Sequence, residues 1–373
     1  MGNFQSFWEN AGTCRYLLIA LALLFLTYIY YIVYRVIVIL HEERDPEEQE
    51  EEGVSVIITA HNRVASLRKN LIGFLIQDYD NYEVIVVDDC SEDDTEELLS
   101  ELQKEYPRLK YTHIYPNTKF RFTKKLAINI GILSAQYDIL LFSEANCYPA
   151  SSSWVRTMRA CFKKETAVVV GFSNFRARKR PFAWKRYFRF THFLEMLLLA
   201  KSLKTILGDG CNMAYRKSYY MRNRGFAGDT QSYIGYDHDM VQELSKYGKV
   251  KVIKKPESYM YVDENKESDD TSYYFASKAR WPLSLRLQTG LDKSIRVSIY
   301  LLSLFLIFSK ILPGYLWILV VSVFLLDVIS INIFAQRFKQ QNLLLTSFVA
   351  NMAGFAYRWY WSGYSFFNSK KWR

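Results

Sequence analysis

Between residues 53 and 143, short apolar segments alternate with segments of helical spacing, and this alternation limits the fold more than any other feature of the sequence. The apolar segments are predicted to be strands over 54–60, 83–88, 110–115 and 138–143, and the first two of these strands are predicted to be buried. The segments with helical spacing are 64–77, 94–106 and 123–136. Strands that are apolar along their length and joined by helices form a parallel sheet with both faces covered. The sequence therefore predicts an α/β domain with a mostly parallel central sheet.

Polar residues follow three of the predicted strands at the points where the strands end. His61, Asn62 and Arg63 follow the first strand, Asp-Asp-Cys-Ser at 88–91 ends the second, and Glu-Ala-Asn at 144–146 ends the fourth. Ligands of such sheets bind at the carboxyl ends of the strands. No GxGxxG follows the first strand and no GxxxxGK[ST] occurs, which argues against a dinucleotide site and a P-loop. An aspartate pair at this edge suits the base and ribose of a nucleotide, although aspartates also occur as plain turn residues.

An apolar run of 25 residues extends from Tyr16 to Leu40. It is long enough to cross about 30 Å of hydrocarbon. A cleaved signal peptide is the alternative, but such a peptide has a shorter apolar run, a basic start and a cleavage site of small residues. We therefore predict an N-terminal transmembrane anchor over 1–41. The acidic stretch 42–52, which has one proline and no aliphatic or aromatic residue, is predicted to be a solvated linker.

A second apolar zone, 297–334, is too long for one ordinary membrane span. The pair Pro313-Gly314 interrupts it and favours a turn. We therefore predict a transmembrane hairpin over 291–336, with one bent or re-entrant hairpin as the alternative.

A third apolar zone, 343–367, contains polar residues and several glycine or serine breaks. We predict that 337–373 forms an interfacial amphipathic helix followed by a basic tail. Basic residues that follow the hairpin prefer the cytoplasmic side of a membrane. The intervening domain, 53–290, is therefore expected to face the cytosol.

The net charge of +10 fits either nucleic acid or an anionic membrane as a partner. The stretch 176–189 interleaves seven basic residues with aromatic residues, and the apolar run 196–200 follows it. Together with the predicted membrane segments, this favours an interfacial helix on anionic lipid over nucleic-acid binding. The five cysteines are scattered without a CxxC pair, which argues against a disulfide framework or a zinc site and suits a reducing cytosol.

Six segments carry motifs that occur together and in a set order. They are VSVIITAHNR (54–63), EVIVVDDCSEDDT (83–95), DILLFSEANCYP (138–149), GDGCNMAYRKSYY (208–220), GYDHDM (235–240) and KARW (278–281). In these segments the chain resembles the family 2 glycosyltransferases of GT-A fold, and most of all their membrane-anchored bacterial members. The resemblance runs from Gly53 to Trp281. It implies a Rossmann-like catalytic domain that transfers a sugar from a nucleotide donor.

The resemblance also implies roles for particular residues. Asp237 would be the general base in a direct, inverting displacement, and Asp88 and Asp89 would contact the nucleotide, either UDP or GDP. The other residues implied at the nucleotide are Ala60, Asn62, Lys124 and Glu144. Those implied on the acceptor side are Asn212, Asp239, Arg280 and Trp281. A divalent cation, Mg²⁺ or Mn²⁺, would stabilise the leaving diphosphate, with Asn146 as its implied ligand.

Three positions depart from the motifs of that family. The DxD motif is Glu144-Ala145-Asn146, the glutamate before the base is Tyr236, and the glutamine of QxxRW is Ser277. Mg²⁺ and Mn²⁺ prefer carboxylate oxygen, so the neutral amide of Asn146 is a weaker ligand. Each change removes a charge or a hydrogen-bonding group from the side where the diphosphate is expected.

Two functions follow as hypotheses. The first is sugar transfer to a membrane-associated, lipid-linked acceptor in cell-envelope glycan or glycolipid synthesis, at the inner membrane and beside other proteins of such a complex. The second is a degenerate, non-catalytic GT-A protein that acts as a membrane scaffold or nucleotide-binding regulator. A processive synthase is disfavoured because the chain has too few predicted spans for a polymer channel. Plain structural roles are also open: Asp237 and Asp239 suit any helix N-terminus, and Trp281 suits a membrane interface.

Overall fold

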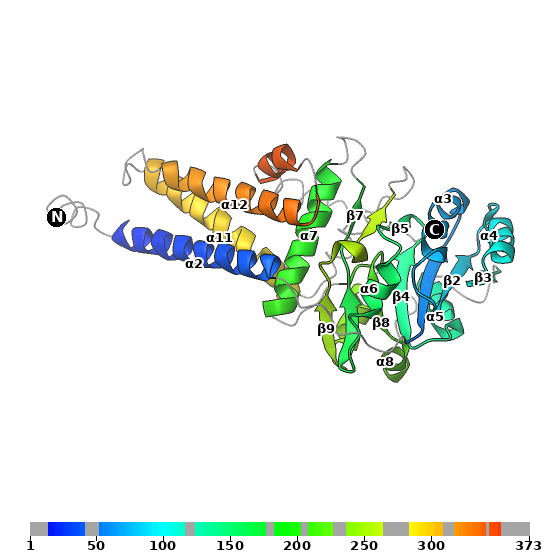
Figure 1. Ribbon diagram of the computed structural model, residues 1–373. Helices are drawn as coiled ribbons and strands as arrows, with labels where there is room; N and C mark the ends of the chain where they lie inside the picture. The colour runs from blue at the N-terminus through cyan, green and yellow to red at the C-terminus, as the bar shows by residue number, and fades with distance from the viewer. Residues whose placement is uncertain are drawn as a thin grey trace. The chain divides into compact units, whose positions relative to one another are not determined.

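The computed structural model describes residues 14–41, 52–115, 124–176, 183–202, 208–226, 236–263, 283–308, 317–340 and 343–351. These residues form two compact units. The smaller unit contains helices α2, α11 and α12, and the larger unit contains all the described strands (Figure 1).

The larger unit is built on a seven-stranded sheet with the order β3-β2-β1-β4-β8-β6-β9. The strands are β1 (Val54–Ala60), β2 (Tyr82–Asp89), β3 (Leu109–Ile114), β4 (Ile139–Glu144), β6 (Thr166–Val170), β8 (Met213–Arg216) and β9 (Lys249–Val252). Strands β1 to β4 pair in parallel, whereas β8 runs antiparallel between β4 and β6. The prediction of a mostly parallel α/β sheet is confirmed.

The first four strands form at the predicted places. Strands β1, β2 and β4 do so because their residues are largely apolar and can be buried on both faces, whereas β3 at the edge of the sheet is only partly buried. Every residue of β1 and β2 is buried. Helix α5 (Lys124–Ser134) packs on this part of the sheet, and Gly131 permits a close approach. A Cβ atom at Gly131 would lie only 2.7 Å from Cγ2 of Ile57. The same packing brings the first residue of α5, Lys124, to the carboxyl edge of the sheet.

Helices α3 (Val64–Leu75) and α4 (Thr95–Glu105), both labelled in Figure 1, follow β1 and β2 in the chain, as predicted. The shorter helices are α6 (Trp154–Arg159), α8 (Lys217–Arg222), α9 (His238–Leu244) and the 3₁₀ turn η2 (Pro256–Ser258). A second sheet has the order β5-β10-β7, with β5 at Cys147–Pro149, β7 at Ser173–Phe175 and β10 at Met260–Val262. This small sheet continues the chain that leaves β4, so it borders the same edge of the domain.

Helix α7 (Ala183–Ser202) contains the second half of the stretch 176–189, which was predicted to be an interfacial helix on lipid. The rings of Phe190 and Phe193 pack on Phe172, with centroids 6.1 and 4.8 Å apart. Arg189 bonds to Ser173 and Asp209 inside the domain. The apolar side of α7 therefore faces the protein, and so does Arg189, the last basic residue of the stretch 176–189. Residues 177–182 lie outside the described part of the chain.

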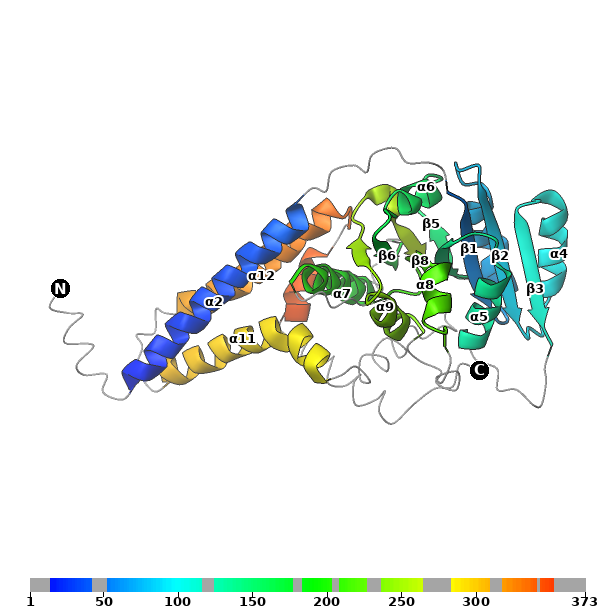
Figure 2. The same ribbon diagram turned by 90° about the horizontal axis from the view of Figure 1, so that it is seen from below.

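The smaller unit consists mainly of α2 (Cys14–Leu40), α11 (Leu283–Phe308) and α12 (Trp317–Arg337), which lie side by side in both views (Figures 1 and 2). Two segments, Arg15–Leu40 and Trp317–Arg337, are long and apolar enough to cross a membrane, and Ser294–Phe308 is a shorter apolar stretch. Helix α11 begins at Leu283, before the expected start of the hairpin at 291. The expected turn at 313–314 lies outside the described residues.

The polarity of this smaller unit is inverted compared with a soluble bundle. Large apolar side chains are exposed along α2 and α12; they are Ile19, Leu23, Leu26, Tyr30, Val33, Ile37, Ile318, Val321, Leu325, Ile329 and Ile333. Charged groups are buried instead. Arg35 of α2 lies 3.1 Å from Oδ1 of Asp327 of α12, and Arg296 of α11 pairs with Oδ2 of the same carboxylate. One aspartate thus joins all three helices.

A further helical segment, 344–351, packs on α12. Asn332 donates a hydrogen bond to Oγ of Ser347 at 2.8 Å, and the rings of Phe324 and Phe348 lie 4.9 Å apart. Its outer face is apolar, since Leu344 and Leu345 are 64% and 76% exposed. Helix α12 reaches Arg337, and the rest of the predicted interfacial helix and basic tail, 352–373, lies outside the described residues.

Candidate active site

The loops after β1 and β2 are held to each other at the carboxyl edge of the sheet. Asn62 has a positive φ of 52°, and its backbone N–H donates to Oγ of Ser91 at 2.8 Å. Its side-chain oxygen accepts a hydrogen bond from the backbone N–H of Glu92 at 2.8 Å. Nδ1 of His61 lies 2.6 Å from the backbone oxygen of Asp89. The predicted nucleotide-side residue Asn62 is therefore placed beside the aspartate pair.

Asp88 and Asp89 are buried, with 0% and 1% of their surfaces exposed. The register places Ala60 opposite Asp88 and Thr59 opposite Glu144, so the sheet brings the ends of β2 and β4 to either side of β1. Oδ2 of Asp88 lies 2.8 Å from Nδ1 of His113, its cross-strand neighbour on β3. His113 was not identified from the sequence.

Three side chains form a compact polar triad at the end of β4. The Lys124 ammonium donates to Oε1 of Glu144 at 2.5 Å and to the Tyr236 hydroxyl at 2.8 Å. The Tyr236 hydroxyl donates to the same Glu144 oxygen at 2.5 Å. Burial by itself would raise the pKa of the Glu144 carboxyl, but the adjacent Lys124 charge and these hydrogen bonds outweigh it and lower that pKa. Glu144 is therefore ionised at neutral pH.

Asp237 follows Tyr236 and caps α9, and its carboxylate accepts a hydrogen bond from the backbone N–H of His238 at 2.8 Å. Two glycines make room for this segment. A Cβ atom at Gly208 would lie 2.6 Å from the backbone oxygen of Asp237, and one at Gly210 would lie 2.1 Å from the Tyr236 hydroxyl oxygen. The motif at 208–212 therefore packs directly against the predicted base, which explains why both positions are glycine.

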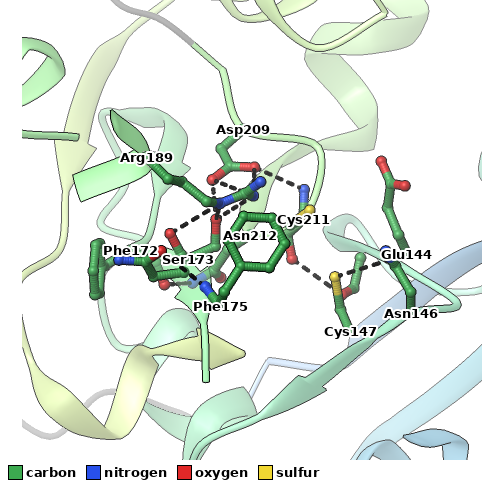
Figure 3. A network of polar contacts seen from close by, with 12 residues as sticks. Glu144, Asn146, Cys147, Phe172, Ser173, Phe175, Arg189, Asp209, Cys211 and Asn212 are labelled. Carbon is green, nitrogen blue, oxygen red and sulfur yellow. Dashed lines mark hydrogen bonds and ion pairs between the residues drawn. The ribbon is translucent and has the colours of Figure 1, made fainter. Parts of the chain in front are cut away.

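An ion pair beside this glycine loop was not predicted. Figure 3 shows the Arg189 and Asp209 side chains turned toward one another. Nη2 of Arg189 donates to Oδ1 of Asp209 at 3.1 Å and to Oγ of Ser173 at 2.6 Å, and the Ser173 hydroxyl also bonds to Asp209. This network ties α7 and β7 to the loop at 208–212. The sequence feature that could have indicated this ion pair is Asp209, a charged residue between Gly208 and Gly210.

The remaining predicted residues differ in placement. Asn212 is fully buried, and its side chain donates to the backbone oxygens of Phe172 and Ser258 at 2.8 Å each while accepting from Nε1 of Trp154 at 3.1 Å. These bonds link the residue before β7, the turn η2 and the first residue of α6. The side chain of Asn212 therefore bonds to other residues of the domain. Asp239 is exposed on the first turn of α9. Arg280 and Trp281 lie outside the described residues.

Oxygen donors for a divalent cation lie at the end of β4. Among the described residues, no three His, Cys, Asp or Glu side chains form a group that could hold a metal ion by themselves. Mg²⁺, however, is commonly bound through one or two carboxylates together with substrate phosphates. Glu144, whose side chain is 23% exposed, and Asn146 two residues later supply one carboxylate and one amide oxygen. This donor set fits a cation that a bound diphosphate completes.

Most of the larger unit matches a known protein family. Residues 55–223 match the family described as Glycosyl transferase family 2. The chain carries a family 2 glycosyltransferase domain. The match extends from β1 to α8, so Asp88, Lys124, Glu144 and the glycine loop lie inside it and the Tyr236–Asp237 pair lies beyond its end. The predicted family is therefore confirmed.

Curated relatives of this glycosyltransferase domain are similar over part of their length. An uncharacterized glycosyltransferase, YfnE, of Bacillus subtilis (strain 168) is 31% identical over 137 residues, which cover 36% of this chain and 31% of that protein. The dolichyl N-acetyl-alpha-D-glucosaminyl phosphate 3-beta-D-2,3-diacetamido-2,3-dideoxy-beta-D-glucuronosyltransferase of Methanococcus voltae is 34% identical over 98 residues, covering 26% of this chain and 30% of that protein. The chain thus spans about a third of the length of these relatives.

A solved structure with the same fold is the mannosyltransferase PcManGT of Pyrobaculum calidifontis, in complex with GDP-Man and Mn²⁺. Its TM-score is 0.54 at 17% sequence identity, and the alignment covers 90% of this chain and 98% of that one. At this identity the likeness is one of fold. It agrees with the GT-A fold predicted for the family 2 glycosyltransferase domain.

Proposed function

We propose that this protein is an inverting glycosyltransferase that moves a sugar from a nucleotide donor to a lipid-linked acceptor. The observation that carries the proposal is the placement of the Lys124–Glu144–Tyr236 triad and Asp237 at one edge of a family 2 glycosyltransferase domain. Such a transfer uses a base that takes the acceptor proton and a positive charge that stabilises the leaving diphosphate, and Asp237 and Lys124 can supply these two groups. The relatives YfnE and the Methanococcus voltae enzyme are both named glycosyltransferases.

In the proposed reaction, Asp237 takes the proton from an acceptor hydroxyl while the hydroxyl oxygen attacks the anomeric carbon. The new glycosidic bond forms on the face opposite the leaving group, and the bond to the nucleoside diphosphate breaks. The diphosphate leaves with additional negative charge, which the Lys124 ammonium stabilises. The loops that hold Asp88, Asp89 and Asn62 bind the nucleotide.

A divalent cation is part of the proposal. Glu144 and Asn146 would hold it, and when bound it would supply positive charge against the diphosphate. PcManGT was solved with Mn²⁺ and GDP-Man, which supports a nucleotide sugar and a cation here as well. Binding of the cation to Glu144 would compete with the Lys124 ion pair, so we expect the cation and the nucleotide to bind together.

The membrane association of the acceptor is inferred from the smaller unit. Its helices expose apolar side chains and bury Arg35 and Asp327, an arrangement that suits a hydrocarbon surrounding. The name of the Methanococcus voltae relative specifies a dolichyl-phosphate-linked sugar. An acceptor of that chemistry, with a lipid anchor in the membrane, fits a catalytic domain attached to transmembrane helices. The cytosolic orientation stays a prediction.

The test combines nucleotide binding with one substitution. Purified full-length protein in detergent is titrated calorimetrically with UDP and GDP, each with and without Mn²⁺. We expect one nucleotide to bind, and to bind more tightly with the cation. Asp237→Asn should then abolish transfer to a lipid-linked acceptor and leave the melting temperature unchanged. The matched control is Asp80→Asn, an exposed position before β2 at the opposite end of the strand.

Two results would count against this function. Binding of neither nucleotide would favour the non-catalytic scaffold. Full transfer by Asp237→Asn would show that Asp237 is not the base, even if the nucleotide binds as expected.

A further inference from the structure

Tyr236 links the two parts of the candidate site, which are the Lys124–Glu144 ion pair on the donor side and the predicted base Asp237. Only 3% of its surface is exposed, and its hydroxyl both accepts from Lys124 at 2.8 Å and donates to Glu144 at 2.5 Å. The Lys124 ammonium also lies 4.3 Å from the centroid of the Tyr236 ring. Because Lys124 begins α5 and Glu144 ends β4, the hydroxyl is held by the rigid core of the domain. The phenol is therefore fixed relative to the donor side of the site.

The next residue along the chain is Asp237. Its backbone oxygen accepts a hydrogen bond from the N–H of Val241 at 3.0 Å, and Gly208 packs against the same oxygen. The Asp237 segment is thus confined by α9 on one side and by the glycine loop on the other. A single peptide link joins this confined residue to the tyrosine that bonds with Lys124 and Glu144. A displacement at either end of that link moves the other end.

The hydroxyl of Tyr236 suits this position better than a carboxylate would. A glutamate here, as in the family motif, would place a second negative charge beside Glu144, and like charges in one partly buried site disfavour ionisation. The phenol instead accepts one hydrogen bond and donates another, so Lys124 and Glu144 can both bond to it. A tyrosine at position 236 therefore loses the charge of the family's glutamate but gains hydrogen bonds to both members of the Lys124–Glu144 ion pair.

We propose that Tyr236 is a positioning residue for Asp237, and that it makes the position of Asp237 depend on the charge state of the donor side. A diphosphate that arrives at Lys124 competes with Glu144 for the ammonium. The Tyr236 hydroxyl, bonded to both, responds to that competition, and the Asp237 backbone follows. This inference rests on the proposed function, since it concerns the base of that reaction.

The experiment measures hydrogen exchange of the backbone amides in 236–244 on the full-length protein in detergent. Exchange is recorded without nucleotide and with whichever of UDP and GDP binds, in the presence of Mn²⁺. In the native protein we expect the nucleotide to slow exchange in this segment. In Tyr236→Phe that slowing should be lost, and kcat should fall by about 10- to 100-fold, the scale expected for a misplaced catalytic group. The Kd for the nucleotide should change by less than about threefold.

The matched control is Tyr82→Phe, which removes a buried hydroxyl that donates to the backbone oxygen of Leu75 at 2.7 Å, on β2 and away from the triad. It should keep the slowing and the native kcat. Retention of both by Tyr236→Phe overturns the proposal. A more than tenfold loss of nucleotide affinity in Tyr236→Phe also overturns it, because the hydroxyl would then serve donor binding. If the native protein binds neither nucleotide, the proposed function itself fails, and this inference fails with it.

Discussion

The Tyr236 hydroxyl lies 2.5 Å from Oε1 of Glu144, although the two residues are 92 positions apart in the sequence. This contact joins the end of the central strand β4 to the segment that carries the predicted base. Both residues depart from the motifs of the family, and in the structure the two departures meet. The two residues that differ from the family motifs therefore form a hydrogen bond with each other, and substitutions can test its role.

Gly210→Ala should lower activity through Tyr236. The added Cβ would lie 2.1 Å from the Tyr236 hydroxyl oxygen, so the phenol must move away from Lys124 and Glu144. We expect kcat for sugar transfer to fall by about tenfold or more. Gly73→Ala is the control, because its Cβ would meet its nearest atom, Cδ of Pro149, only at 3.3 Å, and it replaces a glycine inside helix α3. Equal kcat values for the two variants would contradict the argument.

Glu83 should make stability depend on pH. It accepts hydrogen bonds from Ser55 at 2.6 Å, Lys110 at 2.5 Å and the backbone N–H of Gln136 at 2.7 Å. Burial by itself would raise the pKa of Glu83, but these bonds outweigh it and lower that pKa. The stabilisation is therefore complete above the ordinary glutamate pKa and is lost as the pH falls through the lowered value.

Glu83→Gln should accordingly destabilise the larger unit by about 1–3 kcal/mol at pH 7. The difference from the native protein should shrink as the pH is lowered below about 4. Thermal melting across a pH series measures this, with Glu101→Gln at an exposed position of α4 as the control. A difference that stays constant down to pH 3 would refute the role given to the Glu83 charge.

Arg189→Lys should destabilise the larger unit while preserving charge. A lysine has one ammonium and cannot reproduce the planar guanidinium that bonds both Ser173 and Asp209. We expect a loss of about 1–2 kcal/mol in the free energy of unfolding, measured by thermal melting. Arg68→Lys, at an exposed position of α3, should change it by less than about 0.5 kcal/mol. Similar effects of the two variants would mean that the network does not stabilise the fold.

Asp327→Ala should loosen the helices of the smaller unit. It leaves the buried Arg35 and the partly buried Arg296 without their shared carboxylate, and breaking a buried ion pair in this way costs about 3–5 kcal/mol. Thermal melting and protease protection in detergent measure the loss. The triple variant Arg35→Met, Asp327→Leu, Arg296→Met should recover most of it, because apolar residues of similar volume often replace such a cluster without cost. A triple variant as unstable as Asp327→Ala would refute this.

The sequence by itself determined the elements of the larger unit between residues 53 and 143 and the edge of the sheet that carries its polar groups. Strands β1, β2 and β4 were predictable because residues buried on both faces must be apolar along the whole strand. The placement of Asp88 and Glu144 at one edge of the sheet also followed, since parallel strands end at the same edge. The two apolar helices long enough to span a membrane were equally visible as continuous apolar runs.

Only the tertiary structure decided which polar side chains meet. The Tyr236–Glu144 contact, the Arg189–Asp209 ion pair and the Arg35–Asp327 ion pair join residues 92, 20 and 292 positions apart. The structure also showed that Asn212 is engaged within the domain and that α7 packs on the protein. Hydrophobic periodicity records how each segment is buried, and it contains no information about which distant segment lies against it. Pairings of this kind depend on the path of the whole chain, and they exist only once the fold has formed.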